Sequence, residues 1–465
     1  MGGQMGDFLS VSELVAATGG IANSLDSGLL GRSPHGIVTD TRGLHGGEVF
    51  LALRGEHFDG HDFVETALTK GAIAAIVENS WTGGDPQWPT IAVNDTLEAY
   101  QAIAREWRDR FSIPVVGVTG SVGKTTTKEL IAAVLAACSG AQVLKTERNY
   151  NNEIGVPKTL LQLQATHQYA VIEMAMRASG EIALLTQIAR PTIAVITNVG
   201  TAHIERLGSE AAIARAKCEL LEHLRPDGIA ILNHDNARLL DTAAQVWCGR
   251  TVTYGLDGGD VRGELLDPQT LLVNGRRIPL PLPGRHNALN TLAAFTVAQV
   301  LGANLEALEK GIAVELPEGR SRRYEIGDDI AILDESYNAG VESMGAALEL
   351  LAQTPGRRKI AVLGTMKELG ERSAQFHERV GQIARQVQLD ALFIFAEATE
   401  AQAMAAGAIG LPLVEILDPD AADAHDHLAR RVREFAQPGD RILFKASHAM
   451  RLDLAIAQLT ATQTP

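Results

Sequence analysis

Cysteine, basic charge and long apolar runs are all scarce in this chain. Its three cysteines, Cys138, Cys218 and Cys248, have neither disulfide-framework nor metal-cluster spacing, which fits a reducing cytosol. Lys and Arg number 41 against 56 Asp and Glu, and this net charge of −15 argues against a nucleic-acid partner. Polar residues interrupt the most apolar stretch, Leu289–Leu301, so we expect no membrane span. Met1–Leu9 lacks a signal-peptide pattern, and we expect a cytoplasmic protein.

The length of 465 residues predicts two to four domains, and 46% hydrophobic with 21% charged residues is typical of a globular chain. We expect an α/β protein of three domains. Residues 1–104 form a small mixed α/β domain, with a strand at 90–93 and a helix at 96–111. Residues 105–316 form a central domain, and residues 317–465 form a C-terminal one.

Strands and helices alternate in both larger domains, which indicates parallel sheets covered on both faces. We expect the C-terminal domain to be a Rossmann-like, doubly wound fold. Central strands are predicted at 113–119, 169–174, 192–198 and 228–233, and central helices at 124–137, 209–224 and 287–301. C-terminal strands are predicted at 329–334, 359–364, 391–395 and 441–445, and helices at 341–352 and 374–388. Residues 250–282 resemble a local insertion of short β segments.

A glycine-rich turn between a predicted strand and a predicted helix is the sharpest motif. It comprises Gly120, Ser121, Val122, Gly123, Lys124, Thr125 and Thr126. The unpaired N–H groups and dipole of a helix start favour an anion, Lys124 can reach outer phosphates, and the Thr125 hydroxyl can bind Mg²⁺. Val118 stands where the full phosphate-loop pattern has glycine. The strand–turn–helix context still favours nucleotide binding over an ordinary surface turn.

Polar residues also follow the neighbouring central strands. Glu173 and Asn198 end two of them, and His203 follows five residues after Asn198. Ligands of open parallel sheets bind at the carboxyl ends of strands. Each residue alone is more often a helix cap or a satisfied structural group. Beside a phosphate loop, Glu173 and His203 indicate ligands of Mg²⁺.

Lys217 lies on an apolar helical stripe with Ile213, Leu220 and Leu224, so its side chain is expected to face inward. A buried lysine is costly without a partner. Either Lys217 reaches the rim or pairs with a carboxylate, or it is modified. A desolvated lysine loses its proton readily, and the neutral amine can add carbon dioxide to form a carbamate able to hold a metal.

Three further positions have both a structural and a functional interpretation. Asn287 can cap the predicted helix, and Asn290 one turn later can hydrogen-bond to a purine edge. The basic run Gly319–Arg323 is either a solvated linker or the source of an arginine, Arg320, delivered to a γ-phosphate. Asp334 ends a predicted strand, where an acidic residue commonly meets a ribose hydroxyl or a metal.

Several segments resemble the Mur ligase family, to which the folylpolyglutamate synthases are related. Besides the phosphate loop, the matching segments are T-D-T-R at 39–42, A-L-R-G-E-H-F-D-G-H at 52–61, N-Y-N-N-E-I-G-V-P at 149–157, E-M-A-M-R-A-S-G-E-I at 173–182, T-N-V-G-T-A-H-I-E-R-L-G-S at 197–209, G-R-H-N-A-L-N at 284–290, D-E-S-Y-N-A at 334–339, L-G-T-M-K-E-L-G at 363–370 and K-A-S-H-A-M-R-L-D at 445–453. The resemblance covers nearly the whole chain in order. It is strongest to the branch that joins D-alanyl-D-alanine to UDP-N-acetylmuramoyl-tripeptide.

The resemblance implies an ATP-dependent amide ligase of peptidoglycan precursor synthesis, working through an acyl phosphate, and we expect a monomer. It implies that the first domain binds the UDP substrate, the central domain ATP and the C-terminal domain the dipeptide. The implied ATP residues are the phosphate loop with Asn290, Arg320 and Asp334. Two Mg²⁺ ions are implied, with Thr125, Glu173, His203 and a carbamylated Lys217 as ligands. The implied catalytic residues are Lys124, His203, Lys217 and Arg320.

For the UDP substrate the implied residues are Thr39, Asp40, Thr41, Arg42, Asp59, Gly60 and His61. For the dipeptide they are Asn338, Lys445, Ser447 and His448. His448 stands where a K-G-S-R pattern usually has arginine, and E-M-A-M replaces the frequent E-M-G-A at 173–176. The D-N-P-R motif of the diaminopimelate-adding relative is absent. The alternatives are a relative that adds another amino acid, such as a tripeptide-forming ligase or a folylpolyglutamate synthase, or a nucleotide-switched binding protein.

Overall fold

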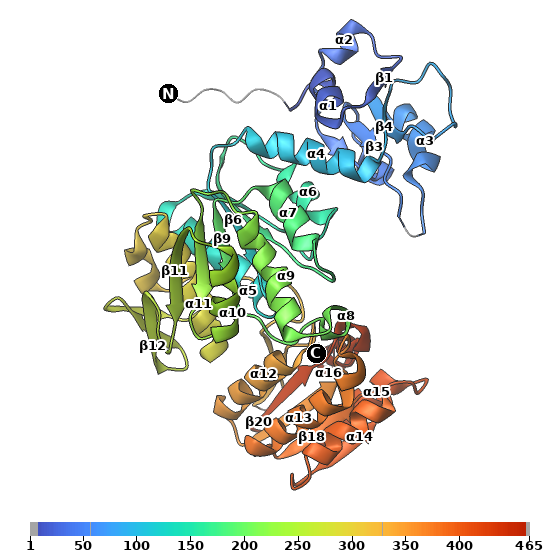
Figure 1. Cartoon of the computed structure of the whole chain (residues 1–465). Helices are drawn as coiled ribbons and strands as arrows, with labels where there is room; N and C mark the ends of the chain where they lie inside the picture. Colours follow the sequence, from blue (N-terminus) through green and yellow to red (C-terminus); the bar gives the residue numbers. More distant parts are fainter. Residues whose placement is uncertain (1–7, 56, 328, 462–465) are drawn as a thin grey trace.

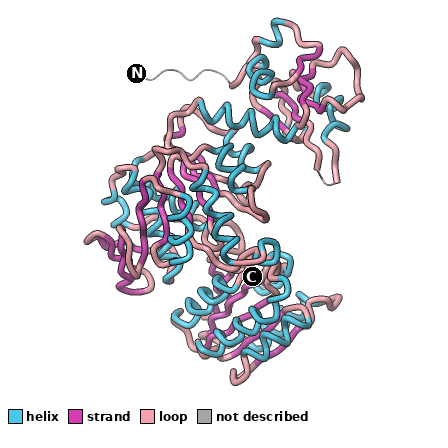
Figure 2. Tube along the Cα trace, viewed as in Figure 1, coloured by secondary structure: helices cyan, strands magenta, loops and turns pink. Residues whose placement is uncertain are grey.

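The computed structural model describes residues 8–55, 57–327 and 329–461, and it forms three α/β domains, each around its own sheet (Figure 1). The domains follow one another along the chain (Figure 1), and each contains both helices and strands (Figure 2). The predicted fold class is therefore confirmed. Within these ranges, no helix combines the length and the apolar character that crossing a membrane requires.

The N-terminal domain has a mixed sheet in the order β1-β5-β4-β3-β2, with β1 antiparallel to β5 and the other pairs parallel. The predicted strand at 90–93 is confirmed as β5. The elements are α1 (Val11–Thr18), β1 (Ile21–Asn23), α2 (Ser27–Leu30), β2 (Ile37–Val38), the 3₁₀ helix η1 (Thr41–Gly43), β3 (Val49–Leu51), η2 (Gly60–Phe63), α3 (Val64–Thr69), β4 (Ala74–Glu78), β5 (Thr90–Val93) and α4 (Thr96–Asp109).

Helix α4 connects the first two domains. Its N-cap Asp95 accepts hydrogen bonds from the N–H groups of Leu97 and Glu98, which fixes where the helix begins. At its other end, the Trp107 ring packs against Phe8, and its Nε1–H donates to the carbonyl of Leu163 in the central domain. The predicted boundary between residues 104 and 105 falls inside this continuous helix.

The central sheet runs β14-β13-β12-β11-β10-β9-β6-β8-β7, and it is parallel from β7 through β12. Its elements are β6 (Val115–Thr119), α5 (Lys124–Ser139), β7 (Gln142–Lys145), α6 (Gly155–Leu160), β8 (His167–Glu173), α7 (Glu181–Ala189), β9 (Ile193–Ile196), α8 (Ile204–Leu207), α9 (Glu210–Glu222), β10 (Ile229–Asn233), α10 (Ala237–Val246), β11 (Arg250–Gly255), β12 (Val261–Asp267), β13 (Thr270–Val273), β14 (Arg276–Pro279), α11 (Arg285–Val300) and η3 (Leu305–Lys310).

Alternate side chains of the central strands pack on opposite faces of the sheet. On β9, Ile193 and Val195 belong to the core under α5 and α11, whereas Ala194 and Ile196 belong to the core under α7 and α9. Both faces are buried, as the alternation of strands and helices predicts. Residues 250–282 are not an isolated insertion, because β11 pairs in parallel with β10 and the following strands extend the same sheet.

The C-terminal sheet has the order β15-β16-β20-β17-β18-β19, with only β15 antiparallel to its neighbour. Its core lies on both faces, under α12, α13 and α14 and under α15 and α16. The elements are β15 (Arg322–Ile326), β16 (Ile330–Asp334), α12 (Val341–Gln353), β17 (Arg358–Gly364), η4 (Gly370–Arg372), α13 (Ser373–Gln386), β18 (Ala391–Phe395), α14 (Ala398–Gly407), β19 (Val414–Leu417), α15 (Ala424–Phe435), β20 (Asp440–Lys445), η5 (His448–Met450) and α16 (Leu452–Thr460).

The basic run at 319–323 is not a linker. Arg322 and Arg323 begin the edge strand β15, where Arg323 pairs with Glu325 on the same strand. An edge strand with exposed charged side chains is a common way to protect a sheet from further pairing. Only Arg320 of the three arginines lines the cavity described next.

Candidate active site

A cavity of about 400 Å³ lies where the carboxyl ends of the central and C-terminal strands meet. Residues at or just after the carboxyl ends of β6, β8, β9, β16 and β20 line it, as expected for parallel sheets. The lining residues that matter below are Ser121, Val122, Gly123, Lys124, Thr125, Thr126, Glu173, Thr197, Asn198, His203, His286, Asn290, Arg320, Glu335, Tyr337, Asn338 and Lys445. Positions more than 300 residues apart in the sequence therefore share one cavity.

The phosphate loop needs its glycines for two different reasons. Gly120 has φ 153°, and a Cβ there would lie 1.9 Å from Thr197 Oγ1. Gly123 has φ 83°, in the left-handed region, and a Cβ there would lie 2.7 Å from Asn290 Oδ1. Both positions therefore exclude a side chain, which keeps the loop's N–H groups accessible at the start of α5.

Asn198 holds the phosphate loop in place. Its Oδ1 accepts from Val122 N–H and its Nδ2 donates to Val122 O, both at 2.9 Å. The next residues add a third contact, since Gly200 N–H donates to Ser121 Oγ at 2.9 Å. From the sequence, Asn198 was predicted only to lie at the end of a strand. The fold shows that its side chain supports the phosphate loop.

Lys124 lies in the first turn of α5, and its Nζ donates to the carbonyl oxygen of Gly120 at 2.7 Å. Burial lowers the pKa of Lys124, nearby Glu173 opposes this, and Arg320 lowers it further. A phosphate group in the cavity would favour the charged form again. Thr125 and Thr126 follow it along the cavity wall, and Thr125 is buried.

Glu173 carries a carboxylate oxygen without a protein partner. Its Oε1 accepts from Asn151 Nδ2 at 2.7 Å, whereas its Oε2 is buried and makes no hydrogen bond. Leaving an anionic oxygen buried and unpaired is costly unless a cation or a donor completes it. Glu173 thus fits the predicted role of a metal ligand.

Lys217 faces inward, as its helical stripe predicts, and only 1% of its surface is exposed. No carboxylate of the described residues pairs with it, which removes the ion-pair interpretation. Burial and the nearby Lys124 place its pKa well below the usual lysine range. Lys217 lies behind the cavity wall rather than on it, and it also lowers the pKa of His203.

His203 lines the cavity, and its Nδ1 lies 2.5 Å from Glu368 Oε2 of the C-terminal domain. Burial is the main cause of its lowered pKa. Across the part of the chain that the structure describes, no three His, Cys, Asp or Glu side chains gather closely enough to hold a metal ion. Glu173 and His203 would need a further oxygen ligand to complete such a site.

The C-terminal domain contributes a second unpaired buried atom, Arg320 Nε. The Arg320 guanidinium lies over the Tyr337 ring, with Cζ 4.1 Å from the ring centre. The contact holds the guanidinium at the cavity wall while leaving Nε free to donate. An anion in the cavity is the natural partner for this group.

Of the remaining predicted ATP residues, Asn290 lines the cavity and Asp334 does not. Asn290 lines the cavity, where its Oδ1 accepts from Thr127 Oγ1 at 3.1 Å. Asp334 is buried beside the cavity and does not line it, because its Oδ1 accepts from the N–H and hydroxyl groups of Ser336. Desolvation raises the pKa of Asp334. The neighbouring Glu335 lines the cavity instead.

The helix start near these residues differs from the prediction. Helix α11 begins at Arg285 with Gly284 as its N-cap, so Asn287 does not cap it and instead donates to the carbonyl of Pro283. Gly284 has φ 99°, which a side chain there would disfavour. The earlier start brings His286, which the sequence analysis did not assign, to the cavity wall.

Of the predicted dipeptide residues, two line the cavity. Lys445 Nζ donates to the carbonyl of Asn338 at 2.9 Å, and both residues line the wall. Ser447 is buried behind it and accepts from Lys367 N–H at 2.9 Å. His448 also lies off the wall and packs against the Tyr337 ring.

The predicted UDP residues are paired within the N-terminal domain. Arg42 is exposed and makes an ion pair with Asp40, which holds the pKa of that carboxyl at about 2. Asp59 caps η2 and contacts His61 Nδ1 at 2.6 Å, while His61 Nε2 accepts from Glu78 N–H at 2.9 Å. His61 is therefore a buried bridge between two segments.

Thr39, Thr41 and Gly60 lie beside these residues. The carbonyl of Thr41 accepts from Lys70 Nζ at 3.0 Å, and a Cβ on Gly60 would lie 2.7 Å from the carbonyl oxygen of Leu53. Thr39 follows β2 directly. Both predicted UDP segments, residues 39–42 and 59–61, lie in a different domain from the cavity.

Three family profiles match consecutive parts of the chain. They are described as Mur ligase family, catalytic domain (residues 33–108), Mur ligase middle domain (118–298) and Mur ligase, glutamate ligase domain (319–448). Two solved structures agree in fold. MurF from Acinetobacter baumannii has a TM-score of 0.84 at 32% identity, covering 97% of this chain and 98% of that one. MurF ligase from Thermotoga maritima in complex with ADP has a TM-score of 0.79 at 31% identity, covering 91% and 97%.

Curated relatives extend the similarity over almost the full length. A UDP-N-acetylmuramoyl-tripeptide–D-alanyl-D-alanine ligase of Synechocystis sp. is 55% identical over 425 residues, 91% of this chain and 92% of that protein. The ligase of the same name from Bacillus subtilis is 35% identical over 443 residues, 91% and 93% of the two chains. With this identity over this length, and with the phosphate loop, Glu173 and His203 lining one cavity, the chain belongs to the Mur ligase family.

Proposed function

We propose that the protein is an ATP-dependent ligase that joins D-alanyl-D-alanine to UDP-N-acetylmuramoyl-tripeptide in peptidoglycan precursor synthesis. The observation that carries the proposal is the pair of buried, unpaired atoms at the phosphate-loop cavity, Glu173 Oε2 and Arg320 Nε. One requires a cation or donor and the other an anion, and a nucleotide with Mg²⁺ supplies both. The names of the relatives support UDP-N-acetylmuramoyl-tripeptide as the carboxylate substrate and D-alanyl-D-alanine as the amine substrate.

The reaction must activate a carboxylate, because neither oxide nor hydroxide leaves readily at neutral pH. The γ-phosphoryl group of ATP passes to the terminal carboxylate of the tripeptide, giving an acyl phosphate and ADP. The amine nitrogen of D-alanyl-D-alanine then attacks the carbonyl carbon and the bond to phosphate breaks. The products are the amide, inorganic phosphate and one proton.

Positive charge at the cavity fits the first of these steps. In our proposal, Lys124 and the N–H groups of residues 123–126 hold the β- and γ-phosphates, and Arg320 meets the γ-phosphate from the opposite domain. Their charge stabilises negative charge on the transferring group. We propose that contact between the two domains around the cavity limits the access of water that would hydrolyse the acyl phosphate.

The donor set fits Mg²⁺, and we propose two ions. Thr125, Glu173, His203 and a carbamate on Lys217 would hold them. When bound, Mg²⁺ neutralises charge on the phosphate oxygens. The carbamate is supported by the complete burial of Lys217, the absence of any carboxylate partner among the described residues, and its lowered pKa. The modification would replace a buried amine by the oxygen ligand that Glu173 and His203 lack.

The other partners are assigned by domain. We propose that Asn338 and Lys445 at the cavity contact the dipeptide, that Ser447 and His448 support them from behind, and that the N-terminal domain binds the UDP moiety. Asn290 faces the adenine, and Asp334, one residue from the cavity wall, serves the ribose only if a side-chain rearrangement exposes it. We propose that the protein acts as a monomer. The three cysteines without disulfides support a cytoplasmic location.

Phosphate release tests the proposal. Purified protein is incubated with ATP and Mg²⁺ together with each substrate alone and with both, and the ligated product is identified by mass spectrometry. We expect sustained turnover only with UDP-N-acetylmuramoyl-tripeptide and D-alanyl-D-alanine together. Turnover with another amino acid, or with a folate and glutamate, would assign the chain to another branch. Sustained hydrolysis without either substrate would indicate a nucleotide switch.

A further inference from the structure

Two carboxylates of the C-terminal domain bind a single loop of the central domain. This loop comprises residues 200–203 and continues into the first turn of α8 (Ile204–Leu207). It follows β9, carries His203 and contacts the phosphate loop through the bond from Gly200 N–H to Ser121 Oγ. Glu342 and Glu368 reach it from different elements, α12 and the segment before η4. The loop therefore lies between the docked C-terminal domain and the nucleotide cavity.

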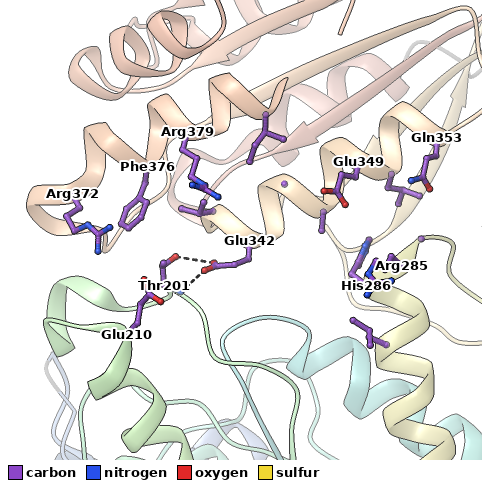
Figure 3. A pocket seen from close by; sticks show the side chains of 17 residues that line it. Thr201, Glu210, Arg285, His286, Glu342, Glu349, Gln353, Arg372, Phe376 and Arg379 are labelled. Atoms are coloured by element: carbon purple, nitrogen blue, oxygen red, sulfur yellow. Dashed lines mark hydrogen bonds between the residues drawn. The ribbon is translucent and has the colours of Figure 1, made fainter. Parts of the chain in front are cut away.

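Glu342 makes the first attachment (Figure 3). Its Oε1 accepts from Thr201 N–H at 2.8 Å, and its Oε2 accepts from Thr201 Oγ1 at 3.1 Å. A Cβ on Gly200 would lie 2.6 Å from Glu342 Oε1, so the carboxylate approaches this closely only because residue 200 is glycine. The contact lies at the edge of a second cavity of about 580 Å³ between the two domains.

Glu368 makes the second attachment, and it contacts three groups in the loop and the first turn of α8. Its Oε2 lies 2.5 Å from His203 Nδ1, its Oε1 lies 3.6 Å from Arg206 Nε, and its carbonyl accepts from Glu205 N–H at 3.3 Å. Both His203 (φ 67°) and Glu368 (φ 63°) have left-handed backbone conformations that non-glycine residues rarely adopt. Such strain persists only where the surroundings fix it, and here each residue's side chain fixes the other.

The segment that carries Glu368 is itself firmly held. Met366 N–H donates to His377 Nε2, and Lys367 N–H donates to Ser447 Oγ, both at 2.9 Å. His377 is fully buried on α13. The carboxylate is thus presented from a rigid part of the C-terminal domain, so its position depends on how that domain docks.

We propose that Glu368 is a positioning residue for His203, and that Glu342 and Glu368 together couple docking of the C-terminal domain to the arrangement of the nucleotide cavity. A carboxylate on Nδ1 fixes the ring orientation and keeps the proton on that nitrogen, which leaves Nε2 as the nitrogen able to bind a ligand. The inference rests on the proposed function, because His203 matters to catalysis only if the cavity binds a metal-nucleotide complex.

The test compares Glu368→Ala and Glu368→Gln with a matched control, Glu371→Gln. Glu371 is an exposed carboxylate three residues further along the same segment and makes no contact with His203. Loss of a carboxylate that orients a metal-binding histidine typically costs about 10- to 100-fold. We expect Glu368→Ala to lower kcat by about that factor while KM for the UDP substrate changes less than about twofold. Glu368→Gln, which keeps an acceptor for Nδ1–H, should recover most of the loss, and Glu371→Gln should match the unaltered enzyme.

Binding without turnover provides the second measurement. Mn²⁺ is titrated into each protein with ADP present and followed by electron paramagnetic resonance. The affinity should fall about 10- to 100-fold in Glu368→Ala and not in Glu371→Gln. Unchanged Mn²⁺ affinity and kcat in Glu368→Ala, or no recovery in Glu368→Gln, would overturn the positioning role. Absence of ligation by the unaltered enzyme would instead refute the proposed function.

Discussion

The nucleotide cavity and the predicted UDP segments differ in how their polar groups are satisfied. At the cavity, Glu173 Oε2 and Arg320 Nε are buried without partners, and Lys217 is buried without a carboxylate. In the predicted UDP segments, Asp40 pairs with Arg42, and Asp59, His61 and the N–H of Glu78 are joined by hydrogen bonds, although Glu48 Oε2 elsewhere in the same domain is buried and unpaired. Unpaired buried atoms indicate where a ligand completes the structure, whereas paired ones indicate a scaffold. Both regions carry motifs that resemble the Mur ligase family. The cavity has buried groups that a ligand would complete, whereas the side chains of the predicted UDP segments already bind one another.

Lys124→Ala should have the largest effect, because it removes the one lysine of the phosphate loop. We expect ligation to fall by about 10³-fold or more, since one lost donor to a developing negative charge already costs about 10²- to 10³-fold. The loop's glycines and Asn198 are untouched, so the circular dichroism and melting temperature should stay unchanged. Near-normal turnover would remove the phosphate-loop assignment.

Lys217→Ala should have the second-largest effect. We expect its ligase activity to fall by about 10²-fold, because the proposed carbamate ligand is removed. Short carboxylic acids added to this variant should partly restore activity by filling the vacated anion site. Lys217→Arg should remain inactive, since arginine keeps its proton and cannot add carbon dioxide. An unmodified ammonium in a crystal of the active, nucleotide-bound enzyme would contradict the carbamate.

Arg42→Ala should raise KM for the UDP substrate by about tenfold, the loss expected for one charge-assisted hydrogen bond. KM for ATP should change much less, because Arg42 lies in a different domain from the cavity. The exposed pair with Asp40 should add no measurable stability, so the melting temperature serves as the control. A change confined to KM for ATP would refute the division of substrates between domains.

His61→Ala should have the smallest catalytic effect and the clearest effect on stability. It removes a buried bridge and leaves Glu78 N–H without its acceptor, which costs about 1 to 3 kcal/mol. We expect a lower unfolding midpoint for the N-terminal domain and a smaller rise in KM for the UDP substrate than in Arg42→Ala. A larger rise than in Arg42→Ala, at unchanged stability, would indicate direct contact between His61 and the substrate.

Local patterns predicted the main elements well. The turn at residues 120–126 predicted α5 from Lys124, and the apolar run at 391–395 predicted β18, because hydrophobic period and glycine position are short-range signals. The α11 start was two residues off, since Gly284 replaced Asn287 as the cap. The edge strands β7, β15 and β19 were missed, because half-exposed strands have weak apolar patterns. The helices α6, α7, α10, α14, α15 and α16 were not predicted either.

By itself, the sequence determined the fold class, the phosphate loop and the inward position of Lys217, because each depends on residues close together in the chain. Only the tertiary structure decided which groups meet at the cavity. It brought Glu368 to His203 and left Arg320 Nε unpaired, and it kept Asp334, Ser447 and His448 off the cavity wall. These outcomes depend on how the C-terminal domain docks, a long-range arrangement that no local pattern of residues encodes.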